Sequence, residues 1–543
     1  MSTMKIYDFI LNRRWPYKQT STIFFIFFLT ACTTQTKETV LAPENIQGRL
    51  AVNTFSMGFR QISERYIENI SVAELAIEGL RGLATIDPTI QIDKNHKTVS
   101  IESSIIQKHI YTAPTSNDAL GWAKLIVAAI SDSKNESDAF KLTKMTRFYE
   151  SIFDGSLSSL DAFSRYTDEK NAQENREKRS GFGGIGIRFK HTQQGVIVTQ
   201  VFAETPAFRA GIKSKDIITH IDNSSLTGIK HSETLKFLRG KIGSIIDIKI
   251  LRPTISTLKV IDFHSFKISI RRDRIIVPTT SYSVRNGVLY IKISSFNDRT
   301  SKHLANDLTK GLEEVLAKST KKAKGIILDL RGNPGGLLKQ AVKVSNLFLI
   351  KGRIISTRGR HPGSSNDYEA HGIDLTEGLP LVVLINGRSA SAAEIVAAAL
   401  QDHARAIVIG STSFGKGTIQ TVIRLPNDGE MAVTWSRFRA PSGYFLHKLG
   451  VPPSICVTGS EKLIATEYIQ KALKQADRNT ETLRAWHATT INQKLERDRL
   501  KTICPTTHKK SPIDIEIAEK LLIDVALYQR VKALSPSIAS VNN

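Results

Sequence analysis

The strongest constraint on the fold is an alternation of short apolar runs with amphipathic stretches between Val288 and Ile409. The apolar runs have the length of buried strands: Val288–Ile293, Gly325–Leu330, Leu381–Ile385 and Arg405–Ile409. Helical periodicity occupies two of the intervals between them, Lys302–Ala317 and Leu338–Phe348. Strands that alternate with helices are typical of an α/β layer, so we expect an α/β core here.

Composition indicates a folded protein of several domains. The chain has 543 residues, of which 41% are hydrophobic and 23% charged, and this excludes disorder along its whole length. The 75 Lys and Arg residues exceed the 51 Asp and Glu residues, and the net charge of +24 favours contact with anionic surfaces. Only 7% of the residues are aromatic, and no Cys/His finger spacing or HExxH motif occurs. Nucleic acid and metal ions are therefore not expected.

The N-terminus has the pattern of an export signal. A basic segment precedes the apolar run Ile23–Leu29, which is too short to span a bilayer as a helix. The sequence Leu-Thr-Ala-Cys that ends at Cys32 resembles the lipobox of bacterial lipoproteins, which implies a signal peptide at 1–31, a lipid on Cys32 and a tether at 32–44. The alternative is an ordinary signal peptide in which this cysteine has no role.

The chain holds 3 cysteines, so Cys456 and Cys504 remain when Cys32 is set aside. In an oxidising compartment this even pair can form a disulfide. Two unpaired thiols remain the alternative.

The rest of the chain divides into segments with different sequence patterns. Residues 45–178 predict a helical domain with a short β-like patch near 97–105, and the charge-dense run 168–180 marks its end. Residues 181–270 consist of short strands and turns with one helix near 232–239. Residues 459–543 predict a basic helical extension without a recognisable site.

The segment 181–270 resembles a PDZ domain, a small β-barrel with a helix. The resemblance rests on Phe182–Ile187, on the phrase Thr-Pro-Ala-Phe-Arg-Ala-Gly-Ile at 205–212, and on Asp-Ile-Ile at 216–218. Small residues allow successive backbone amides to hold a terminal carboxylate, while a strand edge pairs with an extended peptide. The peptide-binding residues would be Gly184, Ile185, Gly186 and Ile187. The alternative is that these glycines only form a tight turn.

Ser391 is the candidate nucleophile. It follows the strand Leu381–Ile385 and opens an alanine-rich helix, where free backbone N–H groups can form an oxyanion site. The spacing Ser391-x-x-Glu394 is also that of a capping box, so a purely structural serine is the alternative.

Lys416 is the candidate base. It lies between two glycines after the strand Arg405–Ile409, and a desolvated lysine loses its proton readily enough to activate a serine. Gln420 can orient such an amine by a hydrogen bond. The same segment, 410–417, approaches a phosphate-binding loop, but Gly417 stands where that motif needs Ser or Thr. Nucleotide hydrolysis is therefore a weaker alternative.

The run Asp329–Leu337 is a glycine turn between a strand and a helix. Such a turn lets a backbone N–H approach a reacting carbonyl closely, and Gly336 and Ala392 are the candidate oxyanion donors.

The order of these motifs resembles that of the carboxyl-terminal processing peptidases of serine peptidase family S41. The motifs are the PDZ-like segment, the DLRGNPGG turn, the SAAEI segment and FGKG followed by Gln. The resemblance covers roughly residues 60–457 and implies a ClpP/crotonase-like protease core at 271–458. It implies a catalytic Ser391 and Lys416 dyad with Gln420. Ala393 replaces a serine of the family pattern, and Val451-Pro452-Pro453 lacks the usual acidic residue.

The resemblance implies a serine endopeptidase that needs no cofactor and cleaves periplasmic proteins selected by their C-terminal tails. It would be a lipoprotein in the periplasm of a Gram-negative bacterium, with unfolded or tail-exposed substrates, an adaptor protein and a homo-oligomer as candidate partners. A mobile PDZ domain would regulate access to the site. The rival from another class is a non-catalytic peptide-binding scaffold.

Overall fold

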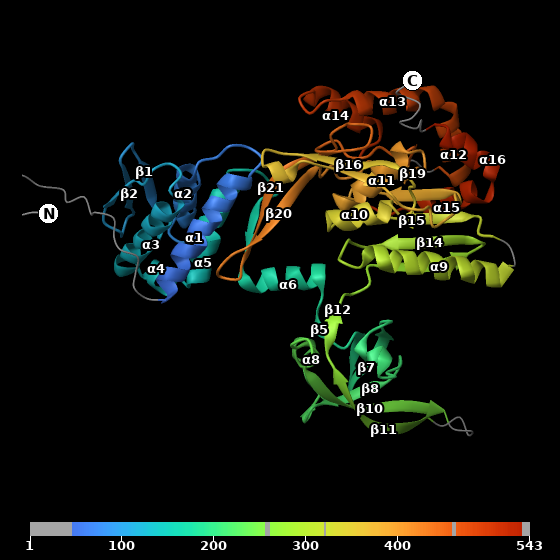
Figure 1. Cartoon of the computed structure of the whole chain (residues 1–543), viewed down its shortest axis with the longest axis horizontal. Helices are drawn as coiled ribbons and strands as arrows, with labels where there is room; N and C mark the ends of the chain where they lie inside the picture. The colour runs from blue at the N-terminus through green and yellow to red at the C-terminus, as the bar shows by residue number, and fades with distance from the viewer. Residues whose placement is uncertain (1–45, 256–260, 320–321, 459–462, 535–543) are drawn as a thin grey trace, which may run out of the picture.

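The computed structural model describes residues 46–255, 261–319, 322–458 and 463–534, and Figure 1 shows them as distinct lobes. N-terminal helices form one lobe, and a long β-ribbon joins them to an α/β core. A small barrel lies below the core in this view, and the C-terminal helices cover the core's outer side (Figure 1). The expected lipidation site, Cys32, lies outside the described residues.

The N-terminal lobe is mainly helical. Its elements are α1 (Ile46–Arg65), α2 (Val72–Arg81), the 3-10 turn η1 (Gly82–Thr85), β1 (Gln91–Lys94), β2 (Thr98–Glu102), β3 (His109–Thr112), α3 (Ala119–Glu136), α4 (Asp138–Leu142) and α5 (Met145–Ser158). The β-like patch in the sequence is β2, the central strand of the sheet β1-β2-β3. Aromatic rings fill the interior, where the Phe55 and Phe153 centroids lie 5.4 Å apart. The same core includes Met431 and Val433 of the ribbon, so this lobe packs directly on it.

The charge-dense run before Gly181 is a helix, α6 (Glu169–Ser180), preceded by the short strand β4 (Arg165–Thr167). Arg179 of α6 donates two hydrogen bonds of 2.8 Å to the carboxylate of Glu430 in the ribbon. Arg239 of the barrel donates to Glu177 of the same helix at 2.6 Å. Helix α6 therefore ties the barrel to the ribbon.

The barrel has a sheet in the order β11-β10-β8-β7-β6, with β9 paired to β8. Its elements are β5 (Phe182–Gly184), β6 (Ile187–Thr192), β7 (Gly195–Val201), α7 (Pro206–Arg209), β8 (Ile217–Ile221), β9 (Ser224–Ser225), α8 (His231–Leu238), β10 (Ile245–Ile255), β11 (Ile261–Arg271) and β12 (Asp273–Ile275). Strand β5 pairs with β12, which closes the barrel at its junction with the core. Strand β6 is an edge of the larger sheet.

The core is built on a sheet in the order β13-β14-β15-β18-β19-β22. Strands β14 (Val288–Ile293), β15 (Gly325–Asp329), β18 (Leu381–Ile385), β19 (Ile407–Gly410) and β22 (Ile455–Cys456) run parallel, while β13 (Thr280–Arg285) is antiparallel to β14. The helices of this region are α9 (Thr300–Ser319), α10 (Leu338–Ser345) and α11 (Ala392–Asp402). Because the strands are parallel, the loops after β15, β18 and β19 emerge at one edge of the sheet.

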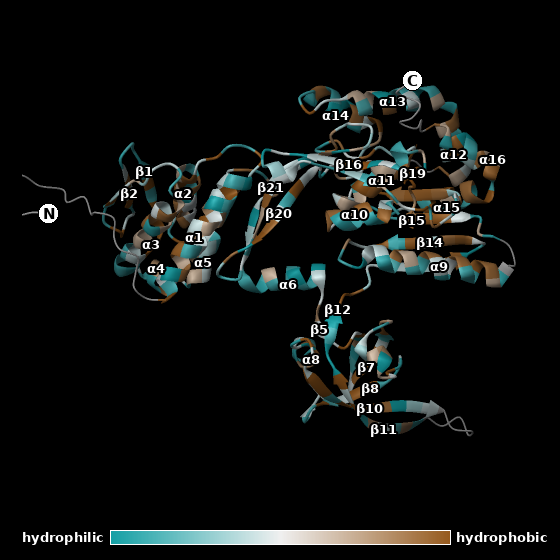
Figure 2. Ribbon diagram, in the orientation of Figure 1, coloured by the Kyte–Doolittle hydropathy of each residue, from teal (hydrophilic) through white to brown (hydrophobic). Residues whose placement is uncertain are grey.

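A second sheet forms the ribbon, in the order β17-β16-β21-β20, and β4 pairs with β21. Its elements are β16 (Gly352–Arg358), the 3-10 turn η2 (Pro362–Ser364), β17 (Asn366–Ala370), β20 (Thr418–Arg424) and β21 (Glu430–Arg439). Figure 2 shows apolar residues concentrated on the parallel core strands and polar residues on α6.

The extension after the core is helical, as expected. It comprises α12 (Ala465–Lys474), α13 (Ala476–Ala488), α14 (Lys494–Ile503), α15 (Pro512–Ile523) and α16 (Val525–Lys532). Residues of α12, α15 and α16 share one buried cluster with the core strands, including Ile327, Leu384 and Ile517. A disulfide joins Cys456 of β22 to Cys504, which follows α14. Within the described ranges, no helix combines the length and apolar character that a membrane crossing requires.

Candidate active site

Ser391 lies at the start of α11 in an unusual backbone conformation. Its φ is 55° and its ψ is −114°, a left-handed conformation that L-residues rarely adopt. An ordinary capping serine is extended, as Ser71 is with φ −80° and ψ 153°. Strained residues of this kind cluster at functional sites, so the conformation favours a functional serine over a simple cap.

The carboxylate of Glu394 connects the loop of Ser391 with the loop of Lys416. Its Oε2 accepts hydrogen bonds from the backbone N–H of Ser391 at 2.7 Å and of Lys416 at 2.9 Å. Its Oε1 accepts from the Gly415 N–H at 2.6 Å and from the Ser413 hydroxyl at 2.5 Å. One oxygen thus holds the backbones of both candidate catalytic residues side by side.

Glu394 is completely buried. Burial raises the pKa of its carboxyl above the usual range, although the bonds from Ser413, Gly415, Ser391 and Lys416 favour the charged form. The sequence identified Glu394 only through its capping spacing to Ser391. Its contacts with the loop of Lys416 could not be predicted from a local sequence pattern.

Lys416 has an environment that favours the neutral amine. Burial lowers its pKa, and the positive charge of Arg165 lowers it further, against the opposite effects of Glu394 and Asp161. Its Nζ lies 5.2 Å from the centre of the Phe163 ring. Asp161 and Phe163 lie between the N-terminal lobe and β4, and Arg165 is the first residue of β4. Sequence reasoning did not identify them.

Gln420 on β20 lies near this segment. Its Nε2 donates to the hydroxyls of Thr418 at 3.0 Å and Thr434 at 3.2 Å, and the Thr434 hydroxyl donates to Asp161 at 3.1 Å. No hydrogen bond between Gln420 and the Lys416 amine is found in the described part of the chain. The orienting role of Gln420 therefore stays a prediction.

The glycine turn packs directly on the serine loop. A Cβ on Gly335 would lie 2.8 Å from the Cβ of Ser391 and 3.0 Å from the backbone nitrogen of Ala392. Gly335 also has a φ of 98°, so a side chain is excluded by both space and conformation. The turn is further held by a 2.9 Å hydrogen bond from the Ser389 hydroxyl to the Leu330 carbonyl. This contact places the turn beside the candidate nucleophile, and the donor roles of Gly336 and Ala392 stay a prediction.

The glycine segment of the barrel lies at the start of the edge strand β6. The carbonyl of Ile185 accepts from the Ala207 N–H at 2.9 Å, and the carbonyl of Gly186 accepts from the Phe202 N–H at 2.9 Å. Gly186 has a φ of 88°. These bonds fix Ile185 and Gly186 between Gly184 of β5 and Ile187 of β6, which is an edge of the sheet formed by the described residues.

The arrangement argues against a nucleotide site. A phosphate-binding loop needs a helix after its lysine, because the helix N-terminus supplies the phosphate-binding amides. Residues 418–424 form strand β20 instead. Among the residues that the structure describes, no group of three or more His, Cys, Asp or Glu could hold a metal ion.

Comparisons with known proteins give a consistent result. The family described as "Peptidase family S41" matches residues 287–457, and the PDZ domain family matches residues 183–260. The chain is 39% identical over 313 residues to the carboxy-terminal-processing protease of Bartonella bacilliformis, which covers 57% of this chain and 70% of that protein. It is 34% identical over 323 residues to the carboxy-terminal processing protease CtpA of Bacillus subtilis, covering 59% of this chain and 66% of that one.

Among solved structures, the chain is similar to the photosystem II D1 C-terminal processing protease. The identity is 24%, the match covers 61% of this chain and 91% of that chain, and the TM-score is 0.32.

The charged groups around Lys416 allow a test in which two variants should shift the pH dependence of Ser391 reactivity in opposite directions. A neutral lysine can accept the Ser391 proton, so phosphonylation of Ser391 by a fluorophosphonate probe, with loss of fluoride, should accelerate as pH rises through the Lys416 pKa. Arg165 lowers the pKa of Lys416 and Asp161 raises it. Arg165→Gln should therefore move the midpoint of the rate profile to higher pH, and Asp161→Asn should move it to lower pH.

Arg147→Gln, which removes an exposed arginine of α5 paired with Glu150, serves as the matched control and should leave the midpoint in place. Midpoints that shift in the same direction in both test variants, or not at all, would contradict this description of the lysine.

Proposed function

The chain belongs to peptidase family S41, the carboxy-terminal-processing serine endopeptidases, and we propose that Ser391 and Lys416 are its catalytic dyad. The observation that carries this proposal is the shared Oε2 of Glu394, which binds the N–H of both residues. The lowered pKa of Lys416 and the strained backbone of Ser391 support the same assignment.

In the proposed reaction, the neutral Lys416 amine accepts the hydroxyl proton while the Ser391 oxygen attacks a peptide carbonyl. The N–H groups of Gly336 and Ala392 stabilise the resulting oxyanion. Lys416 then passes its proton to the leaving amine, and the first product departs. A water molecule, deprotonated by Lys416, hydrolyses the acyl-enzyme and releases Ser391 and a carboxylic acid.

The PDZ domain binds peptide substrates in this proposal. The carboxylate of a substrate tail would lie on the amides of the Gly184–Ile187 loop, and the residues before it would extend the sheet at β6. The edge position of β6 and the bonds that fix the loop support this placement. Substrates are then unfolded or tail-exposed proteins. An adaptor and a homo-oligomer remain candidate partners.

Residues 1–32 support a location at a membrane surface. The apolar run and the sequence before Cys32 suggest export, cleavage and lipid attachment at that cysteine. A lipid and the net charge of +24 together suffice for stable attachment to anionic bilayers. We therefore place the enzyme in the periplasm of a Gram-negative bacterium, bound to the membrane.

Removal of either dyad residue should abolish proteolysis. Ser391→Ala loses the nucleophile and Lys416→Ala loses the base, and because they act as a unit each variant loses most of the rate. Gln420→Ala should lose about 10- to 1000-fold, because it orients rather than transfers a proton. The measurement is cleavage of an unfolded protein with a free apolar C-terminus, without ATP or metal. Normal cleavage by a folded Ser391→Ala or Lys416→Ala variant would falsify the dyad.

Substrate choice should depend on the tail. Amidation of the C-terminus removes a charge-assisted hydrogen bond worth about 1.5 to 3 kcal/mol, so affinity should fall by about one to two decades. An appended Asp-Asp should have a similar effect, because it brings charged side chains to an apolar pocket. One unfolded substrate with a free, an amidated and an Asp-Asp tail provides the comparison. Equal cleavage rates for all three would show that the PDZ domain does not recognise C-termini.

The anchor is tested by Cys32→Ser. This variant should appear in the soluble periplasmic fraction, whereas the unaltered protein should sediment with membranes, because only the latter carries the lipid. Cell fractionation with immunoblotting measures both. A soluble unaltered protein would rule out the lipid anchor.

A further inference from the structure

The segment that joins α14 to α15, residues 504–511, runs along the edge of the core sheet where the catalytic loops emerge. We call this segment the strap. The three loops at that edge are the glycine loop (330–337), the serine loop (386–391) and the lysine loop (411–417). The strap contacts all three loops, and its end at Ser511 accepts a hydrogen bond from Arg331 of the glycine loop.

The lysine loop is bound at its first two residues. The Thr412 hydroxyl donates to the Cys504 carbonyl at 2.6 Å. The Thr507 N–H donates to the Ser411 hydroxyl at 3.1 Å. Ser411 and Thr412 directly follow β19 and are buried, so these bonds fix the direction in which the loop leaves the sheet.

The serine loop is bound in the same way. The Gly387 N–H donates to the Thr507 carbonyl at 2.7 Å, and the Asn386 amide donates to the carbonyls of His508 and Lys509 at 3.3 Å each. A Cβ on Gly387 would lie 2.2 Å from the Thr506 side chain, so the strap packs tightly against this position. Asn386 Oδ1 also accepts from the Gly332 N–H at 2.9 Å and so links the serine and glycine loops.

The glycine loop is bound through a buried charge cluster. Arg331 donates to Asp329 at 2.9 Å, to the Ser511 carbonyl at 2.7 Å and to Asp514 of α15 at 2.8 Å. The Arg331 and Asp514 side chains are each only 4% exposed. A buried arginine needs its partners because an unpaired charge in the interior is costly. The first residue of the loop after Leu330 is therefore anchored by the C-terminal extension.

The contacts share one geometry. In each loop the bound residues lie next to the strand, at 331–332, 386–387 and 411–412, whereas the candidate reacting groups lie further along, at Gly336, Ser391 and Lys416. None of the contacts above places the strap on the reacting groups themselves. It fixes the bases from which those groups project.

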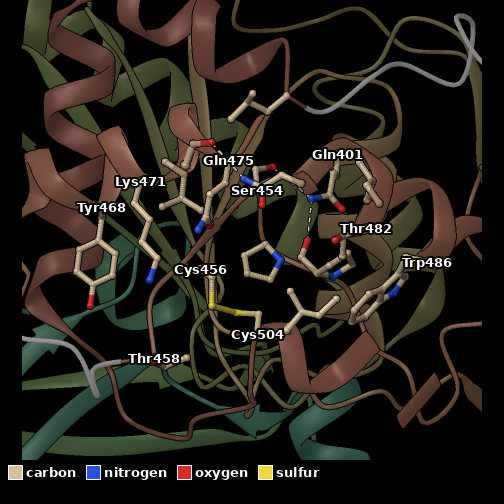
Figure 3. A pocket seen from close by; sticks show the side chains of 18 of the residues that line it. Gln401, Ser454, Cys456, Thr458, Tyr468, Lys471, Gln475, Thr482, Trp486 and Cys504 are labelled. Carbon is tan, nitrogen blue, oxygen red and sulfur yellow. Dashed lines mark hydrogen bonds between the residues drawn. A yellow bond between two sulfur atoms is a disulfide. The ribbon is translucent and has the colours of Figure 1, made fainter. Parts of the chain in front are cut away.

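The disulfide between Cys456 and Cys504 attaches the first residue of the strap to β22 of the same sheet. It borders a cavity of about 280 Å³ between the core and helices α12 and α13. Figure 3 shows both sulfur atoms among the residues that line this cavity, together with Gln475 and Trp486. Cys456 is partly buried, and Cys504 is buried.

We propose that the strap holds the three catalytic loops in register, with Asp514 as a positioning residue that acts through Arg331 and the Cys456–Cys504 disulfide as the anchor of the strap. The proposal rests on the catalytic assignment of Ser391 and Lys416. Displacement of reacting groups by about 1 Å can reduce a rate by about 100-fold, so loss of the strap's attachment should reduce turnover while tail binding persists.

Two perturbations test the proposal on the full chain. Asp514→Asn keeps the size of the side chain and removes the charge that pairs with Arg331. Treatment with dithiothreitol transfers two electrons and two protons to the disulfide, giving two thiols and cyclic oxidised dithiothreitol. The Cys456→Ser/Cys504→Ser double variant reproduces the open state without a reductant and serves as its permanent form.

The measurements are kcat and KM for a tail-bearing unfolded substrate and the affinity of a C-terminal peptide for the PDZ domain. We expect kcat to fall about 10- to 100-fold in Asp514→Asn and in both open-disulfide forms, with KM and peptide affinity unchanged. Oxidised glutathione should restore kcat in the reduced enzyme after the dithiol is removed. An irreversible loss of structure would not be reversed by oxidation.

Asp524→Asn is the matched control. Asp524 is exposed in the same extension, where it caps α16 through the Leu527 N–H at 2.9 Å and lies outside the strap. This variant should retain the unaltered kcat. If Asp514→Asn does not fold, the reduced enzyme and the double serine variant decide the matter.

Failure of this proposal and failure of the dyad give different results. The strap's role would be overturned if the oxidised, unaltered enzyme cleaves normally and kcat is the same after reduction, in the double serine variant and in any folded Asp514→Asn variant. That result would leave the dyad intact. A Ser391→Ala variant as active as the unaltered enzyme would overturn the dyad itself.

Discussion

The site depends on one buried carboxylate. Glu394 is removed from water in the interior of the core, and burial of an isolated carboxylate would cost several kcal/mol. Donors from two separate loops, at Ser391, Ser413, Gly415 and Lys416, compensate for the lost water. Because those donors must converge on two oxygen atoms, the loops that follow β18 and β19 cannot move independently. Their alignment is therefore a requirement for the burial of a charge.

Residues 161–165, which follow the N-terminal lobe, contribute to the environment of the proposed base, Lys416. Strand β4 pairs with β21 and thereby places Phe163 beside the Lys416 amine and Arg165 within electrostatic range of it. The same segment reaches Gln420 through Asp161 and Thr434. A segment more than a hundred residues before the core in sequence thus lies beside Lys416 and affects its protonation. This segment is part of the proposed site.

Local patterns in the sequence identified the elements that carry the site. The strand expected at Leu381–Ile385 is β18 with the same bounds, and the helix expected at 302–317 is α9 at 300–319. Periodicity succeeds here because burial on a sheet or helix repeats at short range. It contains no information about contacts between distant segments, so Asp161, Phe163, Arg165 and Asp514 could not be identified from it. The basic helical extension illustrates the same limit, because its helices were expected but its position against the catalytic loops was not.

The position of the strap near the C-terminus also has a consequence for the order in which the molecule is built. A growing chain that has reached Gln420 already contains each proposed catalytic side chain, but not the segment 504–514 that anchors the loops. Since synthesis proceeds from the N-terminus, the framework of the proposed site is completed only after the rest of the core has been made. On the proposed role of the strap, a chain still being synthesised holds the proposed catalytic residues without the segment that aligns them.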